Sequence, residues 1–265
     1  MFQTIKGPAP AMSERRSGAY RASAARSTVS LLVSFLGGLL VAGCASASRT
    51  PSGGYAAADF SLVLLRTGSA PEGSTEALTQ GQFDFMNELA EQGKLLIAGP
   101  FGPDKDAEDL IGIFLLDEPD VENARELGGG DPLTQAGVLR QEVLPLTTLD
   151  VIRVLPSMET ARQRRREAEG ADMEKPDIRA YTILTAPDGP RAARSIFQHP
   201  AIGSTVVLMA RMRAPREDEL FAILDVPTAA ELRARLEVAN EDGIEVHISE
   251  WYGSPVIAEL AQRGE

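Results

Sequence analysis

The chain has 265 residues, of which 43% are hydrophobic, and it carries a formal charge of −12 and a single cysteine. This acidic balance argues against binding to nucleic acid, which needs a phosphate-neutralising surface, and against lying flat on an anionic membrane. One cysteine cannot form an intramolecular disulfide or a thiolate metal cluster.

The N-terminal residues have the layout of a bacterial export signal. Five basic residues precede an apolar stretch at residues 29–41, which is shorter than the roughly 20 apolar residues of a transmembrane anchor. Residues 40–44 read Leu-Val-Ala-Gly-Cys and resemble the lipobox, in which the cysteine receives a diacylglycerol and becomes the new N-terminus. We therefore expect a lipid on Cys44 and removal of residues 1–43. The loss of five basic residues and one acidic residue then changes the formal charge from −12 to −16.

Several details of this signal stay open. Residues 45–47 (Ala-Ser-Ala) could serve an ordinary secretory signal, Met12 could be the true start, and Arg15-Arg16 hints at twin-arginine export without the usual following residues. Two or three acyl chains would give stable membrane attachment. By analogy with Gram-negative lipoproteins, alanine after the cysteine favours delivery to the periplasmic face of the outer membrane, if the host has one. We expect a lipid-anchored protein of the bacterial cell envelope.

The next segments predict a tether and a first folded domain. Residues 44–58 are rich in Ser, Ala, Gly and Pro, a composition that buries no core and is typical of a flexible tether. Hydrophobic periodicity then predicts strands at 60–65, 95–98, 110–116 and 138–146, and helices at 80–92 and 120–127. The resulting β-α-β-β-α-β order is the ferredoxin-like unit, here assigned to residues 59–155 and called copy one.

A charged segment at 156–176 separates copy one from a similar order of elements. Its interleaved glutamates favour a solvated helical connector over a basic binding surface. Strands are then predicted at 178–184, 205–210, 220–224 and 244–251, with helices at 191–197 and 228–237. We interpret residues 177–265, called copy two, as a degenerate duplicate, although any two such units look alike at this level. Each sheet has an apolar face to cover, so two sheets packed face to face would close into a barrel within one monomer.

Short motifs in copy one are similar to those of a known family. Residues 93–101 read Gly-Lys-Leu-Leu-Ile-Ala-Gly-Pro-Phe, residues 111–113 read Ile-Gly-Ile, and residues 131–133 read Asp-Pro-Leu, with Ala-Gly at 136–137. In these motifs and their spacing, copy one resembles the YCII-related family of small proteins with the dimeric α+β barrel fold. Copy two shares only its strand pattern and the ending Glu-Trp-Tyr-Gly at 250–253. The resemblance implies an α+β fold of tandem ferredoxin-like repeats packed sheet to sheet as an internal dimeric α+β barrel.

The resemblance also implies a pocket on the open sheet face that holds a His–Asp pair for proton transfer. The aspartate of this pair is Asp131, but the histidine position holds Gln82. Glutamine can hydrogen-bond a ligand and cannot carry a proton at neutral pH. We expect Gln82, Gly99, Pro100 and Asp131 to line a polar ligand pocket. A role for Asp131 as a turn or cap before proline is an equal alternative.

Other chemistry in the chain is sparse. His199 precedes a proline, where a cap or loop role is expected, and His247 alternates with apolar residues on the last strand, where it faces solvent or is satisfied in the core. The acidic residues at 104–109 lack the order of an EF-hand and are interpreted as a solvated hairpin loop. No metal-spaced cluster, Gly-x-Gly-x-x-Gly motif or P-loop occurs, so neither metal nor cofactor is expected.

Two functional hypotheses follow. The first is a lipid-anchored envelope protein whose tandem YCII-like domain is a non-catalytic module for a small ligand or a protein. The second is a lyase- or isomerase-type enzyme with Asp131 as the acid or base and Gln82 orienting the substrate. The missing histidine favours the first hypothesis, and we expect no substantial proton-transfer turnover from this pair. The retained Gly99-Pro100 and Asp131 keep the second hypothesis open.

Overall fold

The computed structural model describes residues 55–70, 76–172, 175 and 177–260 of the chain. The expected signal at 1–43, Cys44 and most of the expected tether lie outside the described residues. Among the residues that are described, no helix combines the length and the apolar character needed to cross a membrane.

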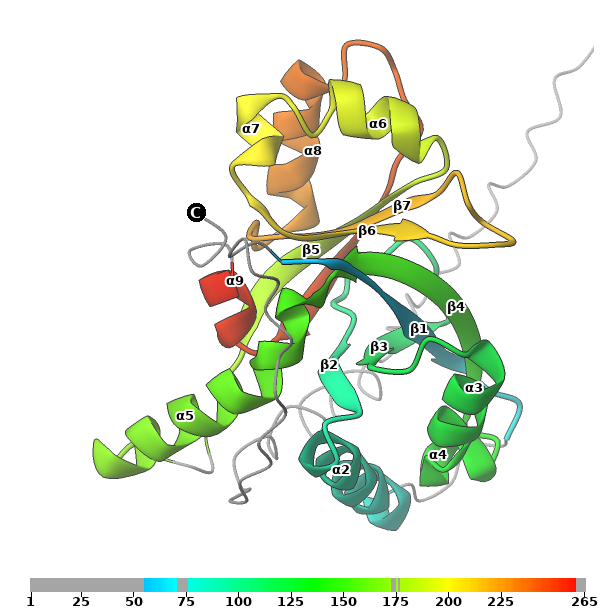
Figure 1. Ribbon diagram of the computed structural model, residues 1–265, viewed down its shortest axis with the longest axis vertical. Helices are drawn as coiled ribbons and strands as arrows, with labels where there is room; N and C mark the ends of the chain where they lie inside the picture. The colour runs from blue at the N-terminus through cyan, green and yellow to red at the C-terminus, as the bar shows by residue number, and fades with distance from the viewer. Residues whose placement is uncertain (1–54, 71–75, 173–174, 176, 261–265) are drawn as a thin grey trace, which may run out of the picture.

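The first half has the expected ferredoxin-like order, with a short helix added before its last strand (Figure 1). The cap of α3 is the one that the sequence predicts, since the Asp120 side chain accepts a hydrogen bond from the backbone N–H of Asn123 at 2.9 Å. The added helix, α4, begins with proline directly after Asp131. The elements are β1 Ala57–Thr67, α2 Glu76–Glu91, β2 Leu95–Pro100, β3 Leu110–Leu116, α3 Val121–Gly129, α4 Pro132–Gln135 and β4 Leu139–Leu149.

A short 3-10 helix and a longer helix connect the two halves, and the same order of strands then recurs. The connecting elements are η1 Asp150–Val154 and α5 Leu155–Ala168. The second half also has two additional short helices, α7 and α9. Its elements are β5 Arg179–Ala186, α6 Gly189–Ser195, α7 Pro200–Gly203, β6 Val206–Met212, β7 Leu220–Leu224, α8 Ala229–Ala239, β8 His247–Gly253 and α9 Val256–Leu260.

The strands form one eight-stranded antiparallel sheet that returns on itself as a nearly closed barrel. Its order is β2-β3-β1-β4-β6-β7-β5-β8, so each half contributes four neighbouring strands. The halves join where β4 pairs with β6, through Leu146 and Met212. On the other side, Phe101 bridges to Trp251 just beyond the end of β2. These two seams confirm the expected internal barrel of two ferredoxin-like halves.

The continuous apolar runs in the strands are explained by burial on both faces of the sheet. Phe60 and Leu62 point into the barrel and pack with Tyr181 and Trp251 of the second half. Val63, the next residue along β1, packs instead in a separate core with the helices of its own half. The helices of the second half cover a third core on the outer face of their strands. The helices thus lie outside the barrel (Figure 1), and apolar side chains of both halves pack inside it.

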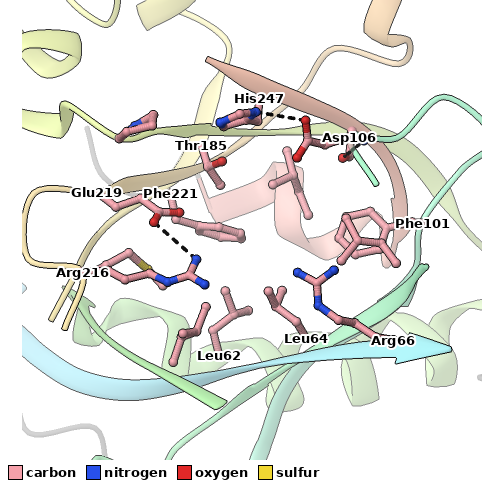
Figure 2. Close-up of a pocket in the computed structure, with 16 residues that line it drawn as sticks. Leu62, Leu64, Arg66, Phe101, Asp106, Thr185, Arg216, Glu219, Phe221 and His247 are labelled. Atoms are coloured by element: carbon pink, nitrogen blue, oxygen red, sulfur yellow. Dashed lines mark hydrogen bonds and ion pairs between the residues drawn. The ribbon is translucent and has the colours of Figure 1, made fainter. Parts of the chain in front are cut away.

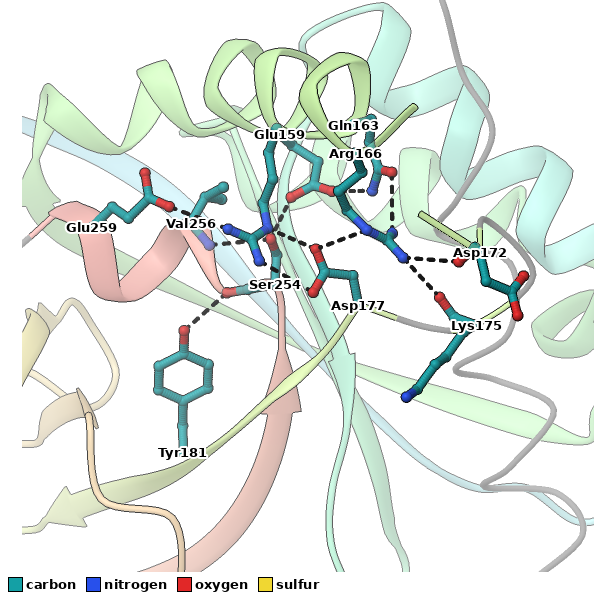
Figure 3. A network of polar contacts seen from close by, with 11 residues as sticks. Glu159, Gln163, Arg166, Asp172, Lys175, Asp177, Tyr181, Ser254, Val256 and Glu259 are labelled. Atoms are coloured by element: carbon teal, nitrogen blue, oxygen red, sulfur yellow. Dashed lines mark hydrogen bonds and ion pairs between the residues drawn. The ribbon is translucent and has the colours of Figure 1, made fainter. Parts of the chain in front are cut away.

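The connector α5 is held to the second half by a polar network (Figure 3). Arg162 donates to both carboxylate oxygens of Asp177, at 2.7 and 3.2 Å, and this contact holds the pKa of Asp177 below its usual range. Arg166 pairs with the same carboxylate at 3.5 Å. Glu159 contacts Ser254, whose carbonyl oxygen accepts a hydrogen bond from the Tyr181 hydroxyl at 2.9 Å. Some basic side chains of α5, Arg162 and Arg166, therefore hold the connector to the second half, while others face solvent.

Candidate functional site

A cavity of about 220 Å³ lies inside the barrel, and both halves contribute to its wall (Figure 2). The apolar part of this wall comes from strands of both halves and includes Leu62, Leu64, Leu144, Ile183, Met212 and Phe221. Polar side chains complete it, namely Arg66, Asp106, Thr185, Arg216, Glu219, His247 and Ser249. A cavity of this kind can surround the apolar body of a small molecule and fix its orientation through a few polar contacts.

Two arginines from different halves meet at this cavity through a shared carboxylate. Glu142 on β4 accepts from Arg66 Nε at 3.0 Å and from Arg216 Nη2 at 2.5 Å. Arg66 also pairs with Asp109 at 2.8 Å, and Arg216 with Glu219 at 3.4 Å. Figure 2 shows both guanidinium groups directed into the cavity. Each guanidinium carries more N–H donors than these carboxylates use, so donors remain for a ligand.

A histidine–carboxylate pair lies on another part of the same wall. His247 on β8 places Nδ1 3.0 Å from Oδ1 of Asp106, which lies in the loop between β2 and β3 of the other half. The backbone N–H of Asp106 donates to Ser249 Oγ at 2.9 Å, which ties the loop to β8. Of the two alternatives expected for His247, solvent-facing or satisfied in the core, the first describes its exposure. Its side chain is 39% exposed, yet it lines the cavity and has a specific partner.

Gln82 and Asp131 contact each other at a buried place between α2 and α4. Gln82 is 1% and Asp131 0% exposed, and Gln82 Nε2 donates to Asp131 Oδ2 at 3.3 Å. Asp131 also accepts from the Leu133 N–H at 3.2 Å and from the Thr134 hydroxyl at 2.8 Å, as the N-cap of α4. Burial raises the pKa of Asp131, and these hydrogen bonds oppose the rise. The cap alternative from the sequence accounts for the contacts with Leu133 and Thr134, whereas the contact with Gln82 joins two helices.

Gly99 and Pro100 lie at the end of β2, next to the seam with the second half. A Cβ atom on Gly99 would lie 1.9 Å from the Tyr252 carbonyl oxygen and 2.8 Å from the Trp251 ring, so only glycine fits. Neither these two residues nor the Gln82–Asp131 pair is among the residues that line the barrel cavity.

The acidic loop at 104–109 is the hairpin between β2 and β3, partly exposed as the sequence suggested, and it also bridges the two halves. Asp104 forms two hydrogen bonds to Arg233 on α8, at 2.6 and 2.8 Å, and Arg233 holds the pKa of Asp104 below its usual range. Asp106 contacts His247, and Asp109 pairs with Arg66 in its own half. The sequence of this loop does not predict these partners, because they lie far away along the chain.

The other expected features have plain structural roles. His199 is the N-cap of α7 and accepts the Ala201 N–H at 3.2 Å through Nδ1, as a cap role predicts. Across the part of the chain that the structure describes, no group of three or more His, Cys, Asp or Glu side chains is placed to hold a metal ion.

The sheet order and the seams define an α+β barrel built from two ferredoxin-like halves in one chain. Residues 61–147, within the first half, match the family model of the YCII-related domain, which confirms the resemblance of copy one. No curated protein sequence matches the chain significantly.

Solved structures with similar folds have little sequence in common with the chain. The siroheme decarboxylase NirDL is 10% identical, with a TM-score of 0.39, over 73% of this chain and 71% of that one. "Putative Chlorite dismutase TA0507" is 10% identical, with a TM-score of 0.41, over 77% of this chain and 98% of that one.

Proposed function

We propose that the protein is a lipid-anchored binding protein of the bacterial cell envelope that holds a small organic acid in its barrel cavity. The observation that carries the proposal is the pair of guanidinium groups, Arg66 and Arg216, directed into a cavity with apolar and polar walls and held in place by hydrogen bonds to Glu142. The ligand class is a compact molecule with an apolar body and one carboxylate.

The arrangement of Glu142 supports recognition of an anion. Glu142 contacts both arginines without lining the cavity itself, so it fixes the two side chains before a ligand arrives. Side chains that are already ordered lose less conformational entropy when they bind. Arg66 is 18% exposed, and a carboxylate that reaches it would form charge-assisted hydrogen bonds in partly dry surroundings. The aliphatic side chains opposite would cover the rest of the ligand.

Asp131 has no part in this proposal. Its contacts with Leu133 and Thr134 support a structural role as a helix cap, and its side chain is fully buried. An enzyme that uses Asp131 as its acid or base would need an opening to this carboxyl group. The barrel cavity therefore replaces the Gln82–Asp131 surroundings as the proposed ligand site.

The test uses a matched pair of fluorescent probes, 2-naphthoate and its neutral analogue 2-naphthamide, titrated into the full-length protein. We expect 2-naphthoate to bind more tightly, and Arg66→Gln to weaken its binding about 10- to 100-fold, since a hydrogen bond to a charged group is worth about 1.5–3 kcal/mol. Arg140→Gln is the control, because Arg140 also pairs with Asp109, at 2.5 Å, and does not line the cavity. Equal binding of both probes, or equal loss in both variants, would contradict the proposal.

The anchoring part of the proposal rests on the Leu-Val-Ala-Gly-Cys match at residues 40–44. We expect the intact mass of the membrane-extracted protein to correspond to a chain that starts at Cys44 and carries two or three acyl groups. A Cys44→Ser protein should keep its leader and lose its lipid. Cleavage and membrane attachment that persist in this variant would refute the lipid anchor.

A further inference from the structure

We propose that His247 and Asp106 form a general-base pair that removes a proton from a molecule held in the barrel cavity. The molecule would have a C–H bond next to a carbonyl group, and Arg66 and Arg216 would stabilise the oxyanion that forms. This inference rests on the proposed function only in placing a small molecule in the cavity. The base is built from both halves, since His247 comes from β8 and Asp106 from the loop after β2.

The contact between the two side chains fixes the protonation pattern of the imidazole. A carboxylate only accepts hydrogen bonds, so Asp106 Oδ1, 3.0 Å from Nδ1, favours Nδ1 over Nε2 as the nitrogen that carries the proton of a neutral ring. Nε2 then carries the lone pair. The Glu245 carboxylate lies 3.6 Å from Nε2, too far for a hydrogen bond, and 74% of its side chain is exposed. Nε2 is therefore available as a base.

The pair lies on the wall of the cavity that the two arginines also line. The loop that carries Asp106 is held by its own N–H to Ser249, two residues beyond His247 on the same strand. The charged side chains that share the cavity with His247 are Asp106, Arg66, Arg216 and Glu219. Figure 2 shows His247 on one wall and the two guanidinium groups on the facing wall. A molecule between them would meet a base on one side and oxyanion donors on the other.

The probe reaction is the ring opening of 5-nitrobenzisoxazole, a neutral bicyclic molecule whose reaction needs only a base. Nε2 takes the proton from the ring C–H, the electron pair of that bond forms the nitrile, and the N–O bond breaks. The product is 2-cyano-4-nitrophenolate, which absorbs visible light, and the imidazolium returns its proton to water. No oxidant, reductant or co-reactant takes part.

The experiment measures this turnover with the full-length protein and four variants. We expect His247→Gln to lower kcat/KM about 100-fold or more, in the range of general-base contributions, and Asp106→Asn to lower it about 10-fold. Glu245→Gln and His199→Asn are the controls. The first changes the carboxylate on the other side of the ring, and the second keeps the cap of α7 while it removes the other histidine.

The outcomes separate this inference from the binding proposal. Turnover that depends on His247 and is inhibited competitively by 2-naphthoate supports both. A protein that binds 2-naphthoate but turns over the probe no faster than His247→Gln overturns the base and leaves the binding proposal standing. Turnover that depends on His247 in a protein that does not bind 2-naphthoate supports the base and refutes the organic-acid ligand. Equal loss in His247→Gln and His199→Asn overturns the assignment of the base to His247.

Discussion

Replacing Asp131 by asparagine should remove a buried charge and keep the helix cap. Asp131 is 0% exposed, and its oxygens accept hydrogen bonds from the Leu133 N–H, the Thr134 hydroxyl and the Gln82 amide. In Asp131→Asn the remaining oxygen can still accept from Leu133. The new amide can donate to Thr134 and, after Gln82 turns its own amide round, to the Gln82 oxygen. That oxygen is buried without a hydrogen-bond partner in the wild type.

The expected magnitudes separate asparagine from alanine. Asp131→Ala removes an N-cap, worth about 0.5–2 kcal/mol, and leaves the Gln82 amide without its acceptor, at about 1–3 kcal/mol. We therefore expect a loss of about 1.5–5 kcal/mol for alanine from these two terms. Asp131→Asn should stay within about 1 kcal/mol of the wild type at neutral pH, because its polar contacts are replaced one for one.

The pH dependence gives the sharper test. Burial raises the pKa of Asp131 above 3.8, so the native state holds this proton at a pH where the unfolded chain has released it. The native state binds more protons in this window, and the contribution of Asp131 to the free energy of unfolding decreases as pH rises through it. Asp131→Asn lacks this decrease. Its stability relative to the wild type should therefore grow with pH above about 4 and then level off.

The assay is urea unfolding at a series of pH values, followed by far-UV circular dichroism and by the fluorescence of Trp251, which is the single tryptophan and is fully buried. Two results would refute the reasoning. One is a loss in Asp131→Asn as large as in Asp131→Ala at pH 7. The other is a difference between Asp131→Asn and the wild type that does not change with pH.

Three further predictions concern the architecture. Gly99→Ala should lower the free energy of unfolding by more than about 3 kcal/mol or fail to fold, because its Cβ would lie 1.9 Å from the Tyr252 carbonyl oxygen. The control Gly129→Ala, whose Cβ would lie 3.5 Å from its nearest neighbour, should unfold at a similar or slightly higher urea concentration than the wild type. Asp177→Asn should lose stability at neutral pH, and the loss should shrink as pH falls through the lowered pKa of Asp177, the opposite sign to Asp131. Light scattering should find a monomer for the protein and aggregates or dimers for each half alone, and two well-behaved monomeric halves would argue against the internal barrel.

Much of the fold could be predicted from local pattern. The apolar runs, the helix stops at glycine and the caps at Asp120 and Thr228 mark the main elements where the structure has them. The short helices α4 and α7 were missed, although each starts with proline after a capping residue, Asp131 or His199. Helices of four residues have no hydrophobic period of their own, so only their caps could have predicted them.

The site was harder to predict because its members meet across the seams. Asp106 and His247 are 141 residues apart, and Glu142 and Arg216 are 74 apart. No spacing in the sequence joins them, because the contacts depend on how one sheet docks on the other. The contact between Gln82 and Asp131 lies within one half, where the family resemblance paired their positions.

The two halves of the barrel place different chemistry at matching positions. Glu142 on β4 pairs with Leu64 on β1, and His247 on β8 pairs with Thr185 on β5. Glu142 and His247 therefore occupy equivalent positions in the two halves. In a barrel made from two identical chains, both positions would carry the same side chain and the two facing walls of the interior would look alike. A single chain escapes that constraint. One wall of this interior has an imidazole with its carboxylate and the facing wall has two guanidinium groups, so a bound molecule can be held in one direction only.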